Sequence, residues 1–272
     1  MLHTSVLKRN NVTVIGDGKQ VMLFAHGFGC DQRAWKFIVD AFTEDYKVVL
    51  FDYTGSGRSD ISQYKQDKYN SLDGYVQDVL DICQTLQLKD VIFVGHSVSS
   101  MIGLLAAVQH PGFFSKLVFI GPSPHYLNAA GYNGGFDRVD LENLFDFMDS
   151  NYMGWSSAIA PAIMGNPERP ELGEFLSDSF CSTDPDIARN FARVTFFSDN
   201  RDDLPKLKVK SLTLQCSEDI IAPFEVGNYV FQNTPGNEFV LLKATGHCPH
   251  ISEPAETIRA IKSYLNSVND EE

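Results

Sequence analysis

One short segment, residues 91–99, restricts the possible folds of this chain more than any other. Its first four residues are apolar and mostly β-branched, and Gly-His-Ser-Val-Ser follows at 95–99. An apolar run that stops at a glycine, a serine and a string of small residues is typical of a strand, a sharp turn and a helix. A serine on such a turn projects its hydroxyl above the sheet, at the positive end of the following helix. We therefore expect Ser97 to be a nucleophile at the end of a buried strand.

The rest of the chain supports an alternation of strands and helices. Leu72–Leu86 carries an apolar stripe at helical spacing, and Val98–Gln109 has the small residues of a helix that packs closely on a sheet. Short β-branched runs lie between such helical patterns. The sequence therefore predicts an α/β fold, with a mostly parallel sheet covered by helices on both faces. The seven predicted strands are Val12–Ile15, Val21–Ala25, Val48–Asp52, Val91–Val94, Leu117–Ile120, Leu212–Cys216 and Phe239–Leu242.

The alternation breaks between residues 125 and 198, where helical patterns follow one another without a convincing strand. The chain length fits one large domain with an insertion, so we expect a core at 1–124 and 199–272 and a helical lid at 125–198. Most of the lid's aromatic residues should pack its helices together, and a minority should line an apolar pocket. Asp184 is placed to cap the last helix. The helical patterns are Asp137–Asn151, Trp155–Met164, Glu171–Cys181 and Pro185–Phe197.

A serine hydroxyl is a weak nucleophile until a base and a third group activate it, and two later segments can supply them. His247 follows the last predicted strand on a glycine-containing loop, and Asp219 follows the strand before it. The order serine, acid, histidine is the one used with this kind of turn, and strand ends are where open α/β sheets place their sites. Alone, each residue has a simpler explanation: a surface serine, a core or metal-binding histidine, a helix-capping aspartate. Together, Ser97, Asp219 and His247 predict a catalytic triad, with Glu218 as the rival acid.

The negative oxygen that develops during acyl transfer needs at least two preorganised hydrogen-bond donors. One should be the backbone N–H of Val98, directly after the nucleophile. The other should come from the turn at 25–29, where glycines on either side of Phe28 let its N–H face inward. We expect His26, in the same turn, to hydrogen-bond within the loop rather than to act as a second base.

Two weaker patterns are interpreted as structural. Gly-Ser-Gly-Arg-Ser at 55–59 has neither the spacing of a phosphate-binding P-loop nor that of a dinucleotide-binding turn, so we expect it to shape a loop. His247 and His250 are three residues apart, but Pro249 between them disfavours the helix that would let both bind a metal. We therefore expect no metal and no cofactor.

Composition excludes several classes of function. The formal net charge is −13, which repels nucleic acid and anionic membrane surfaces. No stretch is apolar and long enough for a transmembrane helix, and residues 1–9 lack the apolar core of a secretion signal. Five widely spaced cysteines without a C-x-x-C pair argue against a disulfide framework, and we expect Cys30 and Cys248 to be small buried thiols. These features favour a cytoplasmic protein.

Taken together, five motifs resemble the α/β-hydrolase superfamily, and the resemblance covers the whole chain. Within it, the chain is similar to the RsbQ-type sigma-B stress regulators and to the plant strigolactone and karrikin receptors. Ser99 stands where most members of the superfamily have glycine, but serine is small enough for the close helix–strand approach that this turn requires. The motifs are Ala25–Gln32, Gly95–Ser99, Ser150–Tyr152 with Trp155, Phe180–Pro185 and Gly246–His250.

The resemblance implies the Ser97, Asp219 and His247 triad, a four-helix lid and a mostly apolar cavity. It implies that this cavity is bounded by Phe28, Tyr126, Phe136, Trp155, Phe196 and Val98. The implied function is a signalling hydrolase that cleaves a small hydrophobic ester or lactone and works with a protein partner. For an RsbQ-type regulator, that partner is a phosphatase with a PAS-type sensor domain.

Two other functions fit the same residues. The first is a stand-alone carboxylesterase or lactonase, which needs no partner. The second is a binding module that has kept the triad without using it. Cofactor-free perhydrolases and lyases share the same triad on this fold, so the sequence alone leaves the reaction open among these classes.

Overall fold

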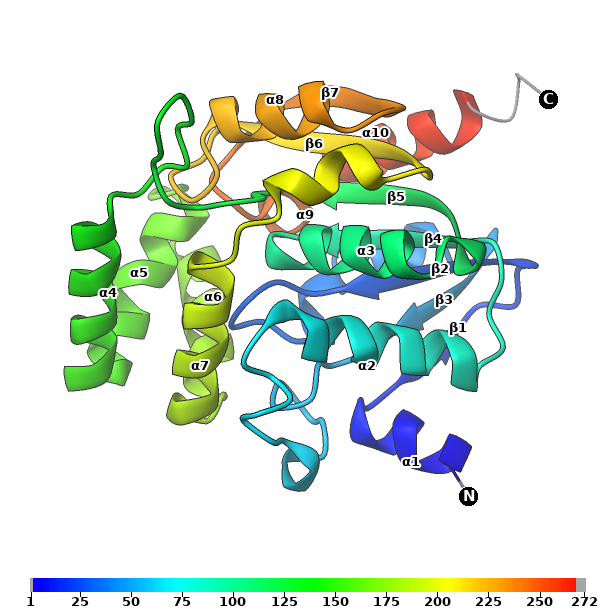
Figure 1. Cartoon of the computed structure of the whole chain (residues 1–272), viewed down its shortest axis with the longest axis horizontal. Helices are drawn as coiled ribbons and strands as arrows, with labels where there is room; N and C mark the ends of the chain where they lie inside the picture. Colours follow the sequence, from blue (N-terminus) through cyan, green and yellow to red (C-terminus); the bar gives the residue numbers. More distant parts are fainter. Residues whose placement is uncertain (1, 268–272) are drawn as a thin grey trace.

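The computed structural model describes residues 2–267, and a seven-stranded sheet forms its centre (Figure 1). The strand order is β1-β3-β2-β4-β5-β6-β7, and every neighbouring pair is parallel except β1 and β3. The predicted α/β arrangement with a mostly parallel sheet is therefore confirmed. The strands are β1 (Thr13–Ile15), β2 (Gln20–Ala25), β3 (Tyr46–Leu50), β4 (Val91–His96), β5 (Phe114–Ile120), β6 (Lys210–Glu218) and β7 (Asn237–Thr245).

Both faces of the sheet are buried, as the alternation of side chains along β2 illustrates. Val21 and Leu23 belong to one core cluster, with residues of α2 and α3, whereas Met22 and Phe24 belong to a second cluster, with residues of α10. A parallel sheet covered on both faces needs apolar side chains in both directions, which explains its nearly continuous apolar strands. The helices around the sheet are α1 (Leu2–Arg9), α2 (Leu72–Thr85), α3 (Val98–Gln109), α8 (Phe224–Asn233), α9 (Pro249–Ser252) and α10 (Pro254–Ser267).

Four helices follow β5 and form an insertion beyond one end of the sheet (Figure 1). The predicted cap of the last helix is confirmed, because the Asp184 carboxylate accepts hydrogen bonds from the N–H groups of Asp186 and Ile187. A third apolar cluster joins this insertion to the loops at the sheet's edge. The division of the chain at residues 125 and 198 stays a prediction. The insertion helices are α4 (Arg138–Ser150), α5 (Tyr152–Met164), α6 (Pro170–Cys181) and α7 (Pro185–Phe196).

The glycine-rich segment at 55–59 wraps around a carboxylate of the protein itself. Asp52 Oδ2 accepts hydrogen bonds from the Arg58 N–H at 2.9 Å and from Asn11 Nδ2 at 2.8 Å. A Cβ on Gly57, whose φ is +53°, would lie 2.5 Å from the same oxygen. The loop therefore needs glycine to approach Asp52, which accounts for the composition that resembles a phosphate loop.

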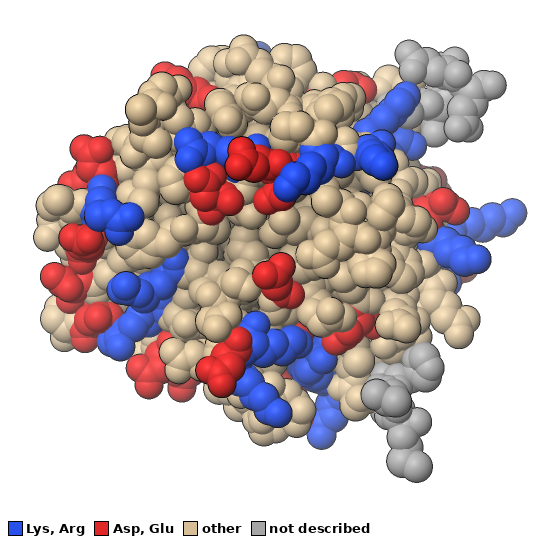
Figure 2. All heavy atoms as spheres, in the orientation of Figure 1, with Lys and Arg blue, Asp and Glu red and all other residues tan. Residues whose placement is uncertain are grey.

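The outer surface carries charges of both signs. Figure 2 shows acidic and basic side chains interspersed on the face turned toward the viewer. Among residues 2–267, no helix has the length and apolar character to cross a membrane.

Candidate active site

Ser97 lies on the sharp turn between β4 and α3, in a backbone conformation that non-glycine residues rarely adopt. Its φ is +57° and its ψ is −124°, and its N–H donates to the Ile120 carbonyl oxygen at 2.8 Å. Gly95 makes the turn possible, since a Cβ there would lie 2.5 Å from the Ser99 carbonyl oxygen. Such strain persists only where the surrounding structure imposes it, and it is found most often at functional sites.

Ser99 takes the place of a glycine in this turn and has a structural use of its own. Its side chain is fully buried, and its hydroxyl donates to the His26 carbonyl oxygen. The same hydroxyl lies 2.9 Å from the Tyr53 hydroxyl. Ser99 therefore links the start of α3 to the loop that contains Phe28.

The structure brings Ser97, His247 and Asp219 together into one chain of hydrogen bonds. Ser97 Oγ lies 2.8 Å from His247 Nε2, and His247 Nδ1 lies 2.7 Å from Asp219 Oδ2. Since a carboxylate can only accept, Nδ1 carries the proton and Nε2 is left to accept from the serine. The three residues are 6%, 4% and 8% exposed, respectively, so bulk water does not compete strongly for these bonds.

Asp219, and not its neighbour Glu218, contacts the imidazole. The other oxygen of Asp219, Oδ1, accepts from the N–H groups of Ile221 at 2.8 Å and Ala222 at 3.0 Å. These two bonds fix the carboxylate while Oδ2 faces His247. Glu218 is the last residue of β6 and is exposed to solvent.

The loop after β2 lies beside Ser97, and His26 has the structural role expected of it. The Nδ1–H of His26 donates to the Gly27 carbonyl oxygen at 2.9 Å, and Nε2 accepts from the Tyr53 N–H at 3.2 Å. Burial lowers the pKa of His26, which keeps the imidazole neutral. Among the main-chain hydrogen bonds of the described residues, the N–H groups of Phe28 and Val98 have no carbonyl partner.

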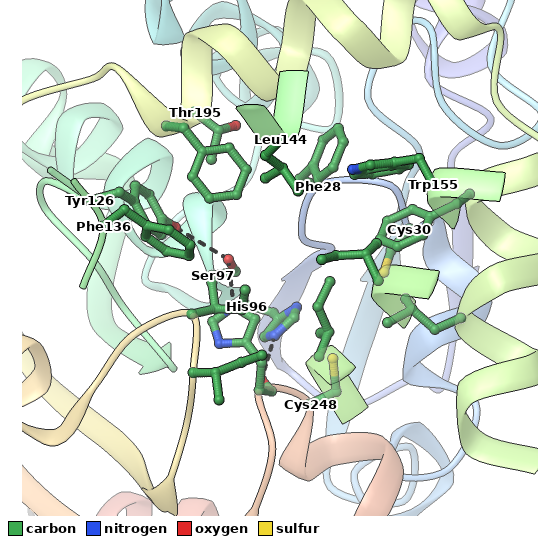
Figure 3. Close-up of a pocket in the computed structure, with 18 of the residues that line it drawn as sticks. Phe28, Cys30, His96, Ser97, Tyr126, Phe136, Leu144, Trp155, Thr195 and Cys248 are labelled. Carbon is green, nitrogen blue, oxygen red and sulfur yellow. Dashed lines mark hydrogen bonds between the residues drawn. The ribbon is translucent and has the colours of Figure 1, made fainter. Parts of the chain in front are cut away.

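A cavity of about 150 Å³ opens onto Ser97 and His247. Figure 3 shows Tyr126 and Phe136 on one side of it and Trp155 and Cys30 on the other. All five side chains predicted to contact a substrate line it: Phe28, Tyr126, Phe136, Trp155 and Phe196. The structure adds lining residues that were not predicted to contact a substrate: Cys30, His96, Asp140, Leu144, Ile159, Ile163, Leu176, Phe180, Thr195, Ile220, Ile221 and Cys248.

One expected boundary residue does not line this cavity. The Val98 side chain belongs instead to the core cluster on the face of the sheet that α2 and α3 cover. This is a correction to the boundary implied by the resemblance. The reason is local packing, since α3 contacts β4 and β5 and Val98, its first residue, is only 1% exposed within that core.

Polar groups in the cavity wall are mostly uncharged. The Tyr126 hydroxyl lies 3.4 Å from Ser97 Oγ, and burial raises its pKa, so it stays protonated. Burial also raises the pKa of the Cys30 thiol to about 12 and that of Cys248 well above its usual value. Both cysteines are buried and free, as expected, and behave as small apolar walls.

Two buried histidines beside the triad were not predicted from sequence as part of the site. The His96 and His250 rings lie 4.5 Å apart, and His250 packs on Trp35 at 4.6 Å. Pro249 begins α9, so His250 is helical whereas His247 precedes the helix. Burial lowers the pKa of both His96 and His250, so both rings are neutral. The only sequence signal for His96 was its place between Gly95 and Ser97.

Comparison with known proteins places the chain in a family. Residues 22–260 match the alpha/beta hydrolase family. The chain is 37% identical over 262 residues to the karrikin insensitive 2 receptor CA of Petunia hybrida, covering 96% of this chain and 97% of the relative. It is 36% identical over 266 residues to a strigolactone esterase of Arabidopsis thaliana, covering 97% and 99%. A solved structure of a hydrolase from Oleispira antarctica, 40% identical, superposes with a TM-score of 0.95 and covers 97% of each chain. The chain therefore belongs to the alpha/beta hydrolase family.

Proposed function

We propose that this protein is a serine hydrolase that cleaves a small hydrophobic ester or lactone. The observation that carries the proposal is the unbroken hydrogen-bonded series from Ser97 through His247 to Asp219, which opens onto a mostly apolar cavity. A serine paired with a base, and a base oriented by a buried acid, is the arrangement that activates a hydroxyl for acyl transfer.

In the proposed mechanism, Ser97 Oγ attacks the carbonyl carbon of the ligand while His247 Nε2 takes the serine proton. Asp219 stabilises the imidazolium that results. The N–H groups of Phe28 and Val98, which have no carbonyl partner, donate to the oxygen that becomes negative. His247 then returns the proton to the leaving oxygen, and water, activated by the same histidine, releases the acyl group from Ser97.

The size of the cavity supports a small ligand. Its volume is about 150 Å³, and an apolar protein cavity of about that size holds a single benzene-sized ring. Its wall consists largely of aromatic and aliphatic side chains, which favour a ligand without charge. A monocyclic lactone, or an ester with a short acyl chain, meets both conditions.

Replacing the nucleophile tests the proposed reaction directly. The Ser97→Ala variant should lose about 10⁴–10⁶-fold in the rate of p-nitrophenyl acetate hydrolysis, and it should no longer be labelled by a fluorophosphonate. Ser211→Ala, which alters a buried serine in β6 outside the cavity, is the matched control and should keep both activities. An unlabelled wild-type protein would favour a binding module over an enzyme.

We further propose that hydrolysis serves signalling through a protein partner, in the manner of an RsbQ-type regulator. The resemblance to this type, together with relatives named as receptors and esterases, supports the proposal. The insertion covers the cavity and also forms part of the outer surface, so it can report on the ligand. A partner phosphatase with a PAS-type domain and a cytoplasmic location remain predictions.

A pull-down separates the signalling role from a stand-alone esterase or lactonase. The tagged protein would be incubated with a candidate PAS-domain phosphatase, with and without p-nitrophenyl acetate, for wild type and Ser97→Ala. Association that depends on either variable is the expected result. No association under any condition, combined with rapid ester turnover, would leave the carboxylesterase or lactonase without a partner.

A further inference from the structure

The main chain of His247 is held on both sides by parts of the molecule far away in sequence. Its N–H donates to the carbonyl oxygen of Ile163, at the end of α5, at 2.8 Å. Its carbonyl oxygen accepts from the Nε2–H of His96, at the end of β4, at 2.9 Å. The peptide that carries the proposed base therefore lies between the insertion and the strand that ends at Ser97.

Two glycines bring the insertion into backbone contact with the loop around His247. Gly165 follows α5 and Gly246 precedes His247, with φ angles of +61° and +79°. A Cβ on Gly246 would lie 1.9 Å from the Met164 carbonyl oxygen, and a Cβ on Gly165 would lie 2.9 Å from Gly246 Cα. No side chain fits between the segments, so the turn between α5 and α6, residues 165–169, rests directly on the loop at 246–248.

Asn166 ties this α5–α6 turn to the end of β7. The residue is 8% exposed, and its Nδ2 donates to the Thr245 carbonyl oxygen at 3.2 Å and to that of Met164. Thr245 returns a contact through Oγ1, which donates to the Gly165 carbonyl oxygen at 3.4 Å. The residues immediately before His247 are thus bonded to the insertion.

Arg169 makes the corresponding tie after His247. Its Nη1 donates to the Ser252 carbonyl oxygen at 2.8 Å, and its Nη2 lies 3.1 Å from Glu253 Oε1. The same Nη2 donates to Asn166 Oδ1, which joins the two ties into one network. A planar guanidinium with several fixed donors suits this role, because it holds three acceptors in a set geometry. Arg169 does not line the cavity.

We propose that Arg169 and Asn166 are positioning residues for His247, so that the α5–α6 turn takes part in catalysis as well as covering the ligand. This inference rests on the proposed function, because it concerns the base of that reaction. Displacing a reacting group by about 1 Å can lower a rate by about 10²-fold. A network that fixes the main chain on both sides of His247 therefore acts on turnover, without touching the substrate.

Substitution of Arg169 tests the proposal, with a second arginine of the insertion as the control. Arg169→Ala should lower kcat for p-nitrophenyl acetate by about 10–100-fold and leave KM within about two-fold, because the cavity wall is unchanged. Arg189→Ala removes another partly exposed arginine of the insertion, which is paired with Asp149 away from the His247 loop. It should leave both parameters within about two-fold of wild type.

A spectroscopic measurement tests the positioning of His247 independently of whether the proposed reaction occurs. The Nδ1–H proton of His247 in its bond to Asp219 can be followed by NMR, which requires no turnover. In Arg169→Ala we expect this resonance to shift or broaden, and in Arg189→Ala to stay as in wild type. If Arg169→Ala does not fold, Glu253→Ala removes one partner of the same tie with a milder change and should show the same direction of effect.

Three results would overturn the inference: an unchanged kcat and resonance in Arg169→Ala, an equal loss in Arg189→Ala, or a loss confined to KM. Failure of the proposed function has a different signature. In that case Ser97→Ala would keep the wild-type rate, whatever happens to the His247 resonance in the arginine variants.

Discussion

The sheet and the helical insertion contribute to the same cavity by different physical means. The sheet supplies Ser97, Asp219 and His247 from the ends of β4, β6 and β7, three strands that are bonded through β5 into one layer. The insertion supplies much of the wall through packed rings, among them Phe196, which contacts the rings of Phe28, Tyr126, Phe136 and Phe145.

The proposed reacting groups are therefore positioned by the sheet, whereas the side chains that limit which ligand can reach them come largely from the insertion. Strand ends are set by main-chain hydrogen bonds that do not depend on side-chain identity, so their relative positions change little when side chains change. Ring packing depends on side-chain volume, and a single substitution alters the space that is left. We therefore expect substitutions at strand ends to change rates, and substitutions of the insertion's ring side chains that line the cavity to change ligand size and stability; the α5–α6 turn, which contacts the His247 loop and does not line the cavity, is the exception.

After replacement of Ser97 itself, the largest effect should follow from changing the acid at the end of β6. Asp219→Asn removes the acceptor that fixes the imidazole tautomer and stabilises the imidazolium, so ester hydrolysis should fall by about 10³–10⁴-fold. Glu218→Gln, one residue earlier, should stay within about two-fold because that side chain is exposed. Steady-state rates of both variants check the prediction, and equal activity of Asp219→Asn and wild type would assign the acid role to Glu218.

A smaller effect, on stability and on ligand size, should follow from removing an aromatic ring that the insertion contributes to the cavity wall. Phe196→Ala should lower the free energy of unfolding by about 3 kcal/mol, because it leaves a cavity among several rings. It should also raise the ratio of kcat/KM for p-nitrophenyl hexanoate over acetate by about ten-fold. Phe147→Ala, an exposed phenylalanine of α4, is the control for both readouts. An unchanged chain-length preference would mean that Phe196 does not limit the ligand.

The third effect appears only at low pH, and it concerns acid stability on the sheet side. Desolvation, followed by repulsion from His247, lowers the pKa of His250 to about 3. An unfolded histidine takes up a proton near pH 6.5, so between pH 6.5 and about 3 the unfolded state binds a proton that the folded state does not. This group therefore makes folding less favourable as the pH falls, by about 1.4 kcal/mol per pH unit within that range.

His250→Phe should remove that contribution while it keeps the ring packing against Trp35 and His96. Urea unfolding at several pH values between 4.5 and 7.5 should show a shallower loss of stability in the variant. Parallel curves for the variant and wild type would show that His250 does not titrate with unfolding.

Local patterns made much of the sheet predictable. All seven strands were located, because a buried parallel strand must be apolar on both faces and such runs are conspicuous. The edge strand β7 is the informative exception: its predicted span was Phe239–Leu242, and it runs from Asn237 to Thr245. Glu238 and Lys243 are exposed near the two ends of this strand. Because charged residues are not typical of a buried strand, the apolar pattern predicts only its middle part. The short helix α1 was not predicted from the sequence, and its eight residues include only three apolar ones.

Residues of the site were predictable where chemistry demands a particular side chain at a particular strand end. Ser97, Asp219 and His247 are of this kind. The contacts that hold His247 were not predictable, because Ile163, Ser252 and Thr245 contribute main-chain oxygens that every residue possesses. Arg169 and Glu253 are 84 positions apart, and no local pattern relates them.

The composition of the cavity wall has a consequence for how a reaction there would end. Hydrolysis of a neutral ester produces a carboxylate anion. No lysine or arginine is among the described residues that line the cavity, so no basic side chain there can pair with this anion. Asp140 contributes the one carboxylate among the described lining residues, and it is exposed to solvent. An apolar cavity solvates a carboxylate product poorly. Release of the acid into water would therefore be favourable, and inhibition by the product would be weak.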